Sequence, residues 1–358
     1  MSNVLRQHSG ARQGKVLAGK AAPVKVELMS GASPNRVHFA NGSISESSCL
    51  RCHDAPCYHY AAGEGECSSL DSLPADRNIE VCPTGAVSII QATGAATVDP
   101  LKCIFCGVCA ARCPVGAIFM SPKQGAVVVD DTNSGFVVTE QYSEPSMLAS
   151  RGAIAKTELT GVHMRESDAL VAEIERRMAA AREKLTDNFP NHLTRNLLRA
   201  VGVAVDMRRT GNNHLRADLV LGSRGISQGV VEAEFGAEAI LDAPRDVLDD
   251  IAVFVSRHGW KKDDIVAFIV GDYLPNRRSE FWSIIKDIRD VLGVQIATVT
   301  VLALMLMVWE RRKLPATINT KAYADCDTLS YRETVLEKLL GRQLDLTKDA
   351  TAFVEVIK

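Results

Sequence analysis

Nine of the ten cysteines of this chain crowd into the stretch between Cys49 and Cys113, and only Cys326 lies outside it. A chain of 358 residues has room for two domains of ordinary size. Disulfide scaffolds are typical of small secreted domains, whereas cysteines concentrated in one part of a longer chain are typical of metal binding. We therefore expect this stretch to bind metal.

The cysteines fall into two runs that repeat one pattern. The second run, VDPLKCIFCGVCAARCPVGAI, has the spacing C-x2-C-x2-C-x3-C and is closed by a proline. The first run, CLRCHDAPC, has the spacing C-x2-C-x4-C, and a CPTGAV segment follows further along the chain. Each set of three cysteines is thus followed by a Cys-Pro-x-Gly-Ala segment. Such an internal repeat predicts two similar metal sites.

This pattern resembles that of bacterial two-cluster ferredoxins, in which the fourth cysteine of each run binds the other cluster. The resemblance covers residues 44–121 and implies two [4Fe–4S] clusters. The ligands that it implies for cluster I are Cys49, Cys52, Cys57 and Cys113. Those that it implies for cluster II are Cys103, Cys106, Cys109 and Cys82.

The first run departs from the family pattern. Its C-x2-C-x4-C spacing is also seen in ferredoxin-like electron-transfer subunits of larger oxidoreductases. The insertion between Cys57 and Cys82 carries Cys67, which we interpret as a loop residue; the alternative is that it replaces Cys57 as a ligand. Zinc is the alternative metal, but zinc sites do not need an interleaved Cys-Pro pattern. The clusters either carry electrons or serve only to stabilise the fold.

Changes in pattern along the chain predict four regions. They are a leader at residues 1–43 with a strand at 24–28, an α+β ferredoxin-like domain at 44–141, a linker at 142–165 and an α/β domain at 166–358. The segment GAVVVDDTNSGFVVTEQ, residues 125–141, predicts a hairpin that completes or covers the ferredoxin sheet.

The second domain shows alternating helical and strand patterns. An amphipathic helix is expected at 167–189, with Pro190 ending it, and a further helix near 194–201. The later elements are strands at 215–221 and 229–235, a helix at 245–258, a buried strand at 265–270, a helix at 279–292, a strand at 294–302 and a last helix that begins at Ser330 and ends at Gly341.

Acidic residues mark two neighbouring strands of this domain. If the loop at 222–228 closes a hairpin that is symmetric about Gly225, then Asp218 lies directly opposite Glu232. Glu234 then shares their face, because side chains along a strand alternate with period two. Three carboxylates on one face repel each other unless a cation lies between them, and oxygen-rich sites of this kind hold Mg²⁺ or Mn²⁺.

A helix, an Asp strand, a Glu-x-Glu strand and a second helix resemble the core of restriction-endonuclease-like (PD-(D/E)xK) nucleases, over residues 166–312. The resemblance implies that Asp218 and Glu232 bind metal and that Glu234 binds or orients the attacking water, so all three are candidate catalytic residues. Here Ala217 replaces the proline of the motif and Glu234 its lysine. The alternative interpretation is an amphipathic strand whose solvent face is acidic.

A basic stretch lies beside these strands. Between His192 and Arg224 there are six arginines and two acidic residues. Such a stretch suits phosphate groups of DNA or RNA; the alternative is an ordinary solvated surface.

Two functions of different class follow. The first is an iron–sulfur protein fused to a Mg²⁺-dependent endonuclease domain, in which the clusters sense redox state or hold the structure. The second is an electron-transfer ferredoxin whose C-terminal domain docks to a redox partner protein. The N-terminus lacks an apolar signal segment and the net charge is −2, so we expect a cytoplasmic protein that does not bind membranes.

Overall fold

The computed structural model describes residues 26–28, 49, 55–61, 63–65, 76, 78–113, 118–121, 125–128, 136–138, 171–185, 188–209, 215–222, 228–309, 312–314 and 337–344. The chain divides into two compact units. We call the first the cysteine-rich unit; it comprises Met1–Glu64, Ile79–Ser167 and Trp309–Arg311. We call the second the sheet unit; it comprises Gly65–Asn78, Asp168–Val308 and Arg312–Lys358.

The described part of the cysteine-rich unit consists of short strand pairs and one short helix, α1 (Val108–Arg112). All three strand pairs in this described part are antiparallel: β2 (Val87–Ile89) with β3 (Ala96–Val98), β4 (Ile118–Ser121) with β5 (Gly125–Val128), and β1 (Val26–Leu28) with β6 (Phe136–Val138). Elements of this length bury little apolar surface, so the unit needs further stabilisation from another source.

The hairpin expected at residues 125–141 is wrong in its pairing. Both apolar runs form strands, but β5 pairs with β4, where Ile118 lies opposite Val128, and β6 pairs with β1, where Val26 lies opposite Val138. The connection between β4 and β5 is only three residues long, and so short a loop makes this local pairing the favoured one. Strand β1 lies within the stretch where the sequence predicts a strand.

The sheet unit is built on a five-stranded mixed sheet with the order β11-β10-β9-β8-β7. Its strands are β7 (Val205–Met207), β8 (Leu219–Leu221), β9 (Gln228–Glu234), β10 (Ile265–Gly271) and β11 (Ile296–Thr300). Strands β7, β8 and β9 form an antiparallel meander, whereas β9, β10 and β11 run parallel. A parallel connection needs a long crossover, which the helices between these strands supply.

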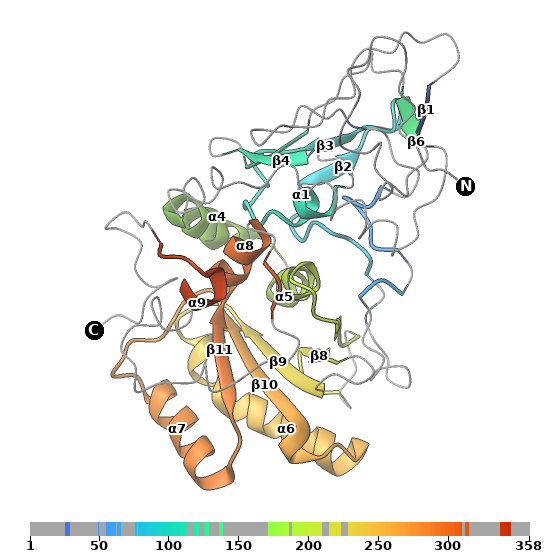
Figure 1. Ribbon diagram of the computed structural model, residues 1–358. Helices are drawn as coiled ribbons and strands as arrows, with labels where there is room; N and C mark the ends of the chain where they lie inside the picture. Colours follow the sequence, from blue (N-terminus) through green and yellow to red (C-terminus); the bar gives the residue numbers. More distant parts are fainter. Residues whose placement is uncertain are drawn as a thin grey trace. The chain divides into compact units, whose positions relative to one another are not determined.

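Helices α6 (Ala243–His258) and α7 (Glu280–Leu292) make these two crossovers (Figure 1). Their apolar side chains share one core with the sheet, in which Phe254 and Phe281 pack with Val230 and Ile269. The predicted C-terminal ends of both helices are confirmed, at Gly259 and at Gly293. Helix α6 begins after Asp242, two residues before the predicted start at 245, and α7 begins after Ser279.

Two further helices precede the sheet, and their boundary corrects the sequence prediction. Helix α4 (Val171–Lys184) ends before Pro190, and Pro190 lies in the first turn of α5 (Phe189–Ala200) instead of ending the preceding helix. Proline is well tolerated there, because the first N–H groups of a helix have no partner within the helix. Sequence analysis also missed β7, whose three residues are too few to show a period.

The apolar run after Gly293 contains a strand and a helix. The strand predicted at 294–302 ends at Thr300, and α8 (Val301–Trp309) follows directly. The hydroxyl of Thr300 accepts a hydrogen bond from the Ala303 N–H at 3.2 Å, which caps the new helix. Among the described residues, no helix combines the length and apolar character that crossing a membrane requires.

The remaining described helices are short. They are the 3₁₀ turns η2 (Ala239–Leu241) and η3 (Lys262–Asp264) and helix α9 (Glu337–Leu340). Helix α9 ends before Gly341, as the sequence predicts, but its predicted start at Ser330 lies outside the described residues.

Candidate functional site

The second cysteine run folds as a tight loop that leads into α1. Phe105 and Gly107 both have positive φ angles, 65° and 78°, and these turns reverse the backbone around Cys106. Cys109 lies within α1 and Cys113 follows its last residue, where the Cys113 N–H bonds to the Cys109 carbonyl oxygen at 3.0 Å. Cys103 and Cys106 thus precede α1, Cys109 lies within it and Cys113 follows it.

Among the described residues, no cysteine forms a disulfide, and most of the thiols are buried. The described cysteines are Cys49, Cys57, Cys82, Cys103, Cys106, Cys109 and Cys113. Burial raises the pKa of the Cys57, Cys106 and Cys109 thiols, and neighbouring cysteines raise it further. Crowded, buried thiols are costly to ionise by themselves, whereas metal binding deprotonates them and compensates the charge. This donor set fits an iron–sulfur cluster.

The cysteines of the first run have a neighbour from the end of the second run. The charges that raise the pKa of Cys57 come from Cys113 and then from Cys49. Cys113 is thus an electrostatic neighbour of a cysteine more than fifty residues away in the sequence. Cys52 and Cys67 lie outside the described residues.

The other described cysteines form a second group around Cys106 and Cys109. Besides burial, Cys82 and Cys103 raise the pKa of Cys106, and Cys106, Cys103, Cys82 and, least, Cys57 raise that of Cys109. The Cys82 sulfur accepts a hydrogen bond from the Ala86 N–H at 3.2 Å, within the CPTGA turn. N–H groups directed at a sulfur stabilise its thiolate form and tune a bound cluster.

The sheet unit brings the three predicted acidic residues together. The β8–β9 register places Leu219 opposite Val231, and Asp218 and Glu232 are the next residues beyond this last pair. One carboxylate oxygen each of Asp218, Glu232 and Glu234 lies within 4.8 Å of the others. The Asn191 side-chain amide donates to Asp218 at 2.9 Å and the Ala233 N–H donates to it at 3.2 Å.

These carboxyl groups are not on an exposed face, which corrects the alternative of an acidic solvent face. Glu232 is only 6% exposed, Asp218 and Glu234 are half-buried, and β9 is buried along nearly all its length because α5 and α6 pack against this central strand. Burial, assisted by the charge of Asp218, holds the pKa of Glu232 well above its usual range and raises that of Glu234 to about 7.

Sequence analysis missed a fourth carboxyl group, that of Asp250 on α6. Asp250 is 2% exposed, and its side chain shares a hydrogen bond with Glu232. Within the described residues, its Oδ2 atom is buried and has no hydrogen-bond partner. The signal was present in the sequence, because Asp250 lies three residues after Val247 and four before Phe254, both of which are buried on the apolar face of α6.

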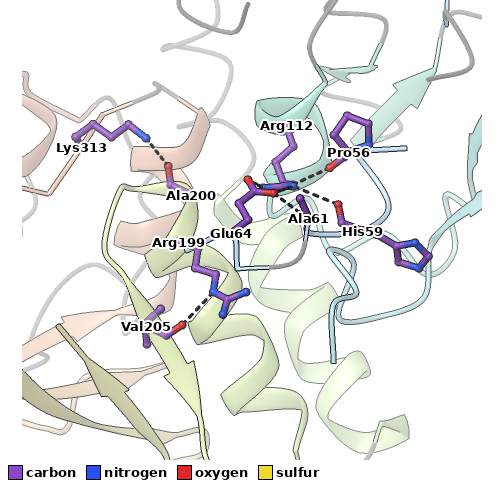
Figure 2. A network of polar contacts seen from close by, with 9 residues as sticks. All are labelled: Pro56, His59, Ala61, Glu64, Arg112, Arg199, Ala200, Val205 and Lys313. Carbon is purple, nitrogen blue, oxygen red and sulfur yellow. Dashed lines mark hydrogen bonds and ion pairs between the residues drawn. The ribbon is translucent and has the colours of Figure 1, made fainter. Parts of the chain in front are cut away.

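Two arginines of the basic stretch are part of the fold. Arg195 is 1% exposed and donates to the Asn78 carbonyl oxygen at 2.8 Å. Arg199 donates to the Val205 carbonyl oxygen at 3.0 Å, as Figure 2 shows, and pairs with Asp206 at 2.7 Å. Neither side chain is available to phosphate groups, so the six arginines do not make one continuous basic surface.

The other arginines have varied surroundings. Arg208 lies 3.8 Å from the Asp218 carboxylate, and Arg216 lies 3.4 Å from that of Asp249. Arg209 is exposed, and Arg224 lies outside the described residues. The positive charges near the acidic cluster therefore already face carboxylates of this chain.

Comparison with known proteins bears on the cysteine-rich unit. Residues 96–119 match the 4Fe–4S binding domain. This chain therefore contains a ferredoxin-type domain that binds a [4Fe–4S] cluster, in agreement with the sequence prediction. No solved structure matches the chain with significance.

Three curated proteins resemble part of the chain. The polyferredoxin-like subunit of an aliphatic sulfonate oxidoreductase from Pyrococcus furiosus is 31% identical over 87 residues, 24% of this chain and 38% of its own length. A ferredoxin from Methanocaldococcus jannaschii is 33% identical over 75 residues, 21% of this chain and 34% of its own. The thiosulfate reductase electron transfer subunit of Salmonella typhi is 30% identical over 110 residues, 31% of this chain and 43% of its own. The chain spans less than half the length of each.

Proposed function

We propose that this protein is an electron-transfer protein that binds two [4Fe–4S] clusters and exchanges electrons with a redox enzyme. The observation that carries this proposal is the match of residues 96–119 to the 4Fe–4S binding domain, in a chain where a second cysteine run repeats the pattern. Two of the similar proteins are named as subunits of oxidoreductases or reductases. The electron-transfer interpretation is thus better supported than the nuclease interpretation as the function of the whole protein.

The proposed ligands follow the interleaved ferredoxin pattern. Cluster I takes Cys49, Cys52, Cys57 and Cys113, and cluster II takes Cys82, Cys103, Cys106 and Cys109. Support comes from the charged neighbours of Cys57, which are Cys113 and Cys49, and of Cys106, which are Cys82 and Cys103; Cys109 is affected most by Cys106, Cys103 and Cys82 and least by Cys57. When bound, each cluster supplies one-electron redox chemistry. The chain contributes thiolates, N–H groups directed at sulfur and the exclusion of water by burial.

Metal analysis tests this proposal directly. Protein purified without oxygen should contain about eight irons and a matching amount of acid-labile sulfide per chain, because each cubane holds four irons. A Cys67→Ser variant should keep both clusters, since eight other cysteines supply the ligands. Stoichiometric zinc without sulfide would contradict the proposal, and one cluster lost from the Cys67 variant would contradict the ligand assignment.

We propose a divalent-metal site in the sheet unit as a second function, with DNA or RNA as its substrate. The specific observation is the approach of the Asp218, Glu232 and Glu234 carboxylates, together with the unpaired buried oxygen of Asp250. Mg²⁺ or Mn²⁺ bound by Asp218 and Glu232 would relieve the repulsion among these groups, and Glu234 would bind or orient a water molecule. The order of a helix, an antiparallel meander, a crossover helix and a parallel strand is consistent with the nuclease resemblance.

Metal-dependent stability and cleavage test this second function. Mn²⁺ at a hundredfold excess over its dissociation constant should stabilise the protein by roughly 2.7 kcal/mol, and plasmid DNA should be cut. Asp218→Ala should abolish both effects, whereas a Glu238→Gln control at an exposed acidic residue should keep them. Absence of a melting shift and of cleavage in the unchanged protein would eliminate the nuclease function.

A further inference from the structure

Helix α1 places a buried positive charge among the cysteines. Arg112 stands between Cys109 and Cys113 in the sequence, and it is only 3% exposed. A buried guanidinium loses most of its hydration, so it is stable only where several acceptors replace the lost water. The acceptors around Arg112 therefore determine how its charge is stabilised and where it is placed.

The Arg112 side chain donates four hydrogen bonds to residues between Pro56 and Glu64 of the cysteine-rich unit (Figure 2). It makes paired bonds of 2.6 and 2.7 Å to the two carboxylate oxygens of Glu64. It also donates to the carbonyl oxygens of Pro56, at 2.7 Å, and His59, at 3.2 Å. Its guanidinium carbon lies 4.0 Å from the centre of the Tyr60 ring. The planar fork of arginine is thereby fixed in position and orientation.

The contacts hold this charge close to the proposed ligands of cluster I. Pro56 directly precedes Cys57, and Arg112 directly precedes Cys113. The Nε atom of Arg112 donates to the Pro56 carbonyl group, which is joined directly to the Cys57 nitrogen by a peptide bond. Glu64 is itself only 6% exposed, so neither member of the pair is screened by water as a surface charge would be.

We propose that Arg112 is a positioning residue that raises the reduction potential of cluster I, and that Glu64 sets how far it does so. The inference rests on the proposed binding of that cluster by Cys49, Cys52, Cys57 and Cys113. Reduction adds negative charge to a cluster, and a fixed cation in a poorly screened interior stabilises the reduced form. Glu64 acts in the opposite direction and also holds the guanidinium in place.

The alternative is that the pair only stabilises the segment between Pro56 and Glu64, and the two roles predict different results. If the pair is purely structural, replacing either Arg112 or Glu64 should affect cluster I in the same way. If the pair acts electrostatically, the two substitutions should shift the reduction potential of cluster I in opposite directions, because one removes a positive charge and the other removes a negative charge.

The experiment is an anaerobic redox titration of the full chain, followed by electron paramagnetic resonance, which reads the two clusters separately. Arg112→Gln should lower the midpoint potential of cluster I and Glu64→Gln should raise it. Arg112→Lys keeps the charge but not the fork, so it should lower the melting temperature while its potential stays nearer to that of the unchanged protein. The potential of cluster II should move less in all three variants.

Lys102→Gln is the matched control. Lys102 directly precedes Cys103, but its side chain is 60% exposed, so its removal should leave both potentials nearly unchanged. The proposal is overturned if Arg112→Gln and Glu64→Gln shift cluster I in the same direction, if neither shifts it, or if all three variants lose cluster I. Protein without iron in its unchanged form would instead contradict the proposed function.

Discussion

Burial is the main cause of the raised pKa values of the carboxyl groups on strand β9. Glu234 is partly buried and faces the charges of Asp218, Asp246 and Asp242, and together these raise its pKa to about 7. In an unfolded chain the same group ionises near its ordinary value of 4.5. The folded protein therefore binds a proton more tightly at this site than the unfolded chain does, which links stability to pH.

The sign of this link gives a prediction for Glu234. A pKa that is raised in the folded state contributes stability below pH 4.5, and this contribution disappears as the pH rises through about 7. With divalent cations removed, Glu234→Gln should therefore be more stable than the unchanged protein at pH 8, by about 1–2 kcal/mol after solvent screening, and nearly equal at pH 5. Chemical denaturation at the two pH values measures this.

A matched substitution checks that the effect belongs to the site. Glu238 is exposed, so Glu238→Gln should change stability little at either pH. If Glu234→Gln gained the same stability at pH 5 as at pH 8, the proposed dependence of stability on the ionisation of Glu234 would be contradicted.

At the scale of elements, the packing of adjacent strands depends on the absence of a side chain at Gly229. A Cβ atom at this position would meet the side chain of Leu221 on β8, and it would lie 2.5 Å from the carbonyl oxygen of Val266 on β10. One neighbour is a side chain that can move, but the other is backbone in the centre of the sheet. Gly229 therefore permits the close pairing that aligns β8, β9 and β10.

This close approach predicts that Gly229→Ala destabilises the sheet unit by about 2 kcal/mol, the usual cost of overpacking. The comparison is Gly259→Ala at the end of α6, where nothing lies within 4 Å but φ is +69°. That change should cost only about 1 kcal/mol, from the left-handed backbone alone. Denaturant unfolding measures both, and a smaller loss at Gly229 than at Gly259 would refute the packing argument.

At the scale of the whole molecule, each proposed cluster draws ligands from distant parts of the chain. Cys113 is the last cysteine of the second run, but its electrostatic effect falls on Cys57 of the first. Cys82 precedes the second run by about twenty residues, and its effect falls on Cys106. Cross-linking by metal would join segments whose own strands are too short to form a stable core.

The interleaved assignment predicts which cluster each substitution removes. Cys113→Ser should abolish the electron paramagnetic resonance signal of cluster I and leave that of cluster II, and Cys82→Ser should do the reverse. Cys326, which lies far from both runs in the sequence, supplies the control, since Cys326→Ser should keep both signals. Loss of the cluster nearest in sequence would show that the two runs bind metal independently.

Much of the local structure followed from sequence alone, because its causes are local. The ends of α6 and α7 depend on residues within one turn, and symmetry about Gly225 predicted the β8–β9 register, which sets Leu219 opposite Val231. The cysteine spacing likewise predicted a 4Fe–4S binding domain, and comparison confirms one at 96–119. Each of these depends on a short repeat or on a cap that neighbouring residues define.

Tertiary structure alone decided which side chains the core encloses and which strands pair. Nothing local distinguishes Arg112 or Arg195 from a surface arginine, yet both are buried because acceptors distant in the sequence surround them. The pairing of β6 with β1 joins strands about 110 residues apart, so it depends on long-range competition for partners. Spacing determined which residues of this chain have the chemistry to bind metal, whereas burial and long-range contacts determined the charges that surround them.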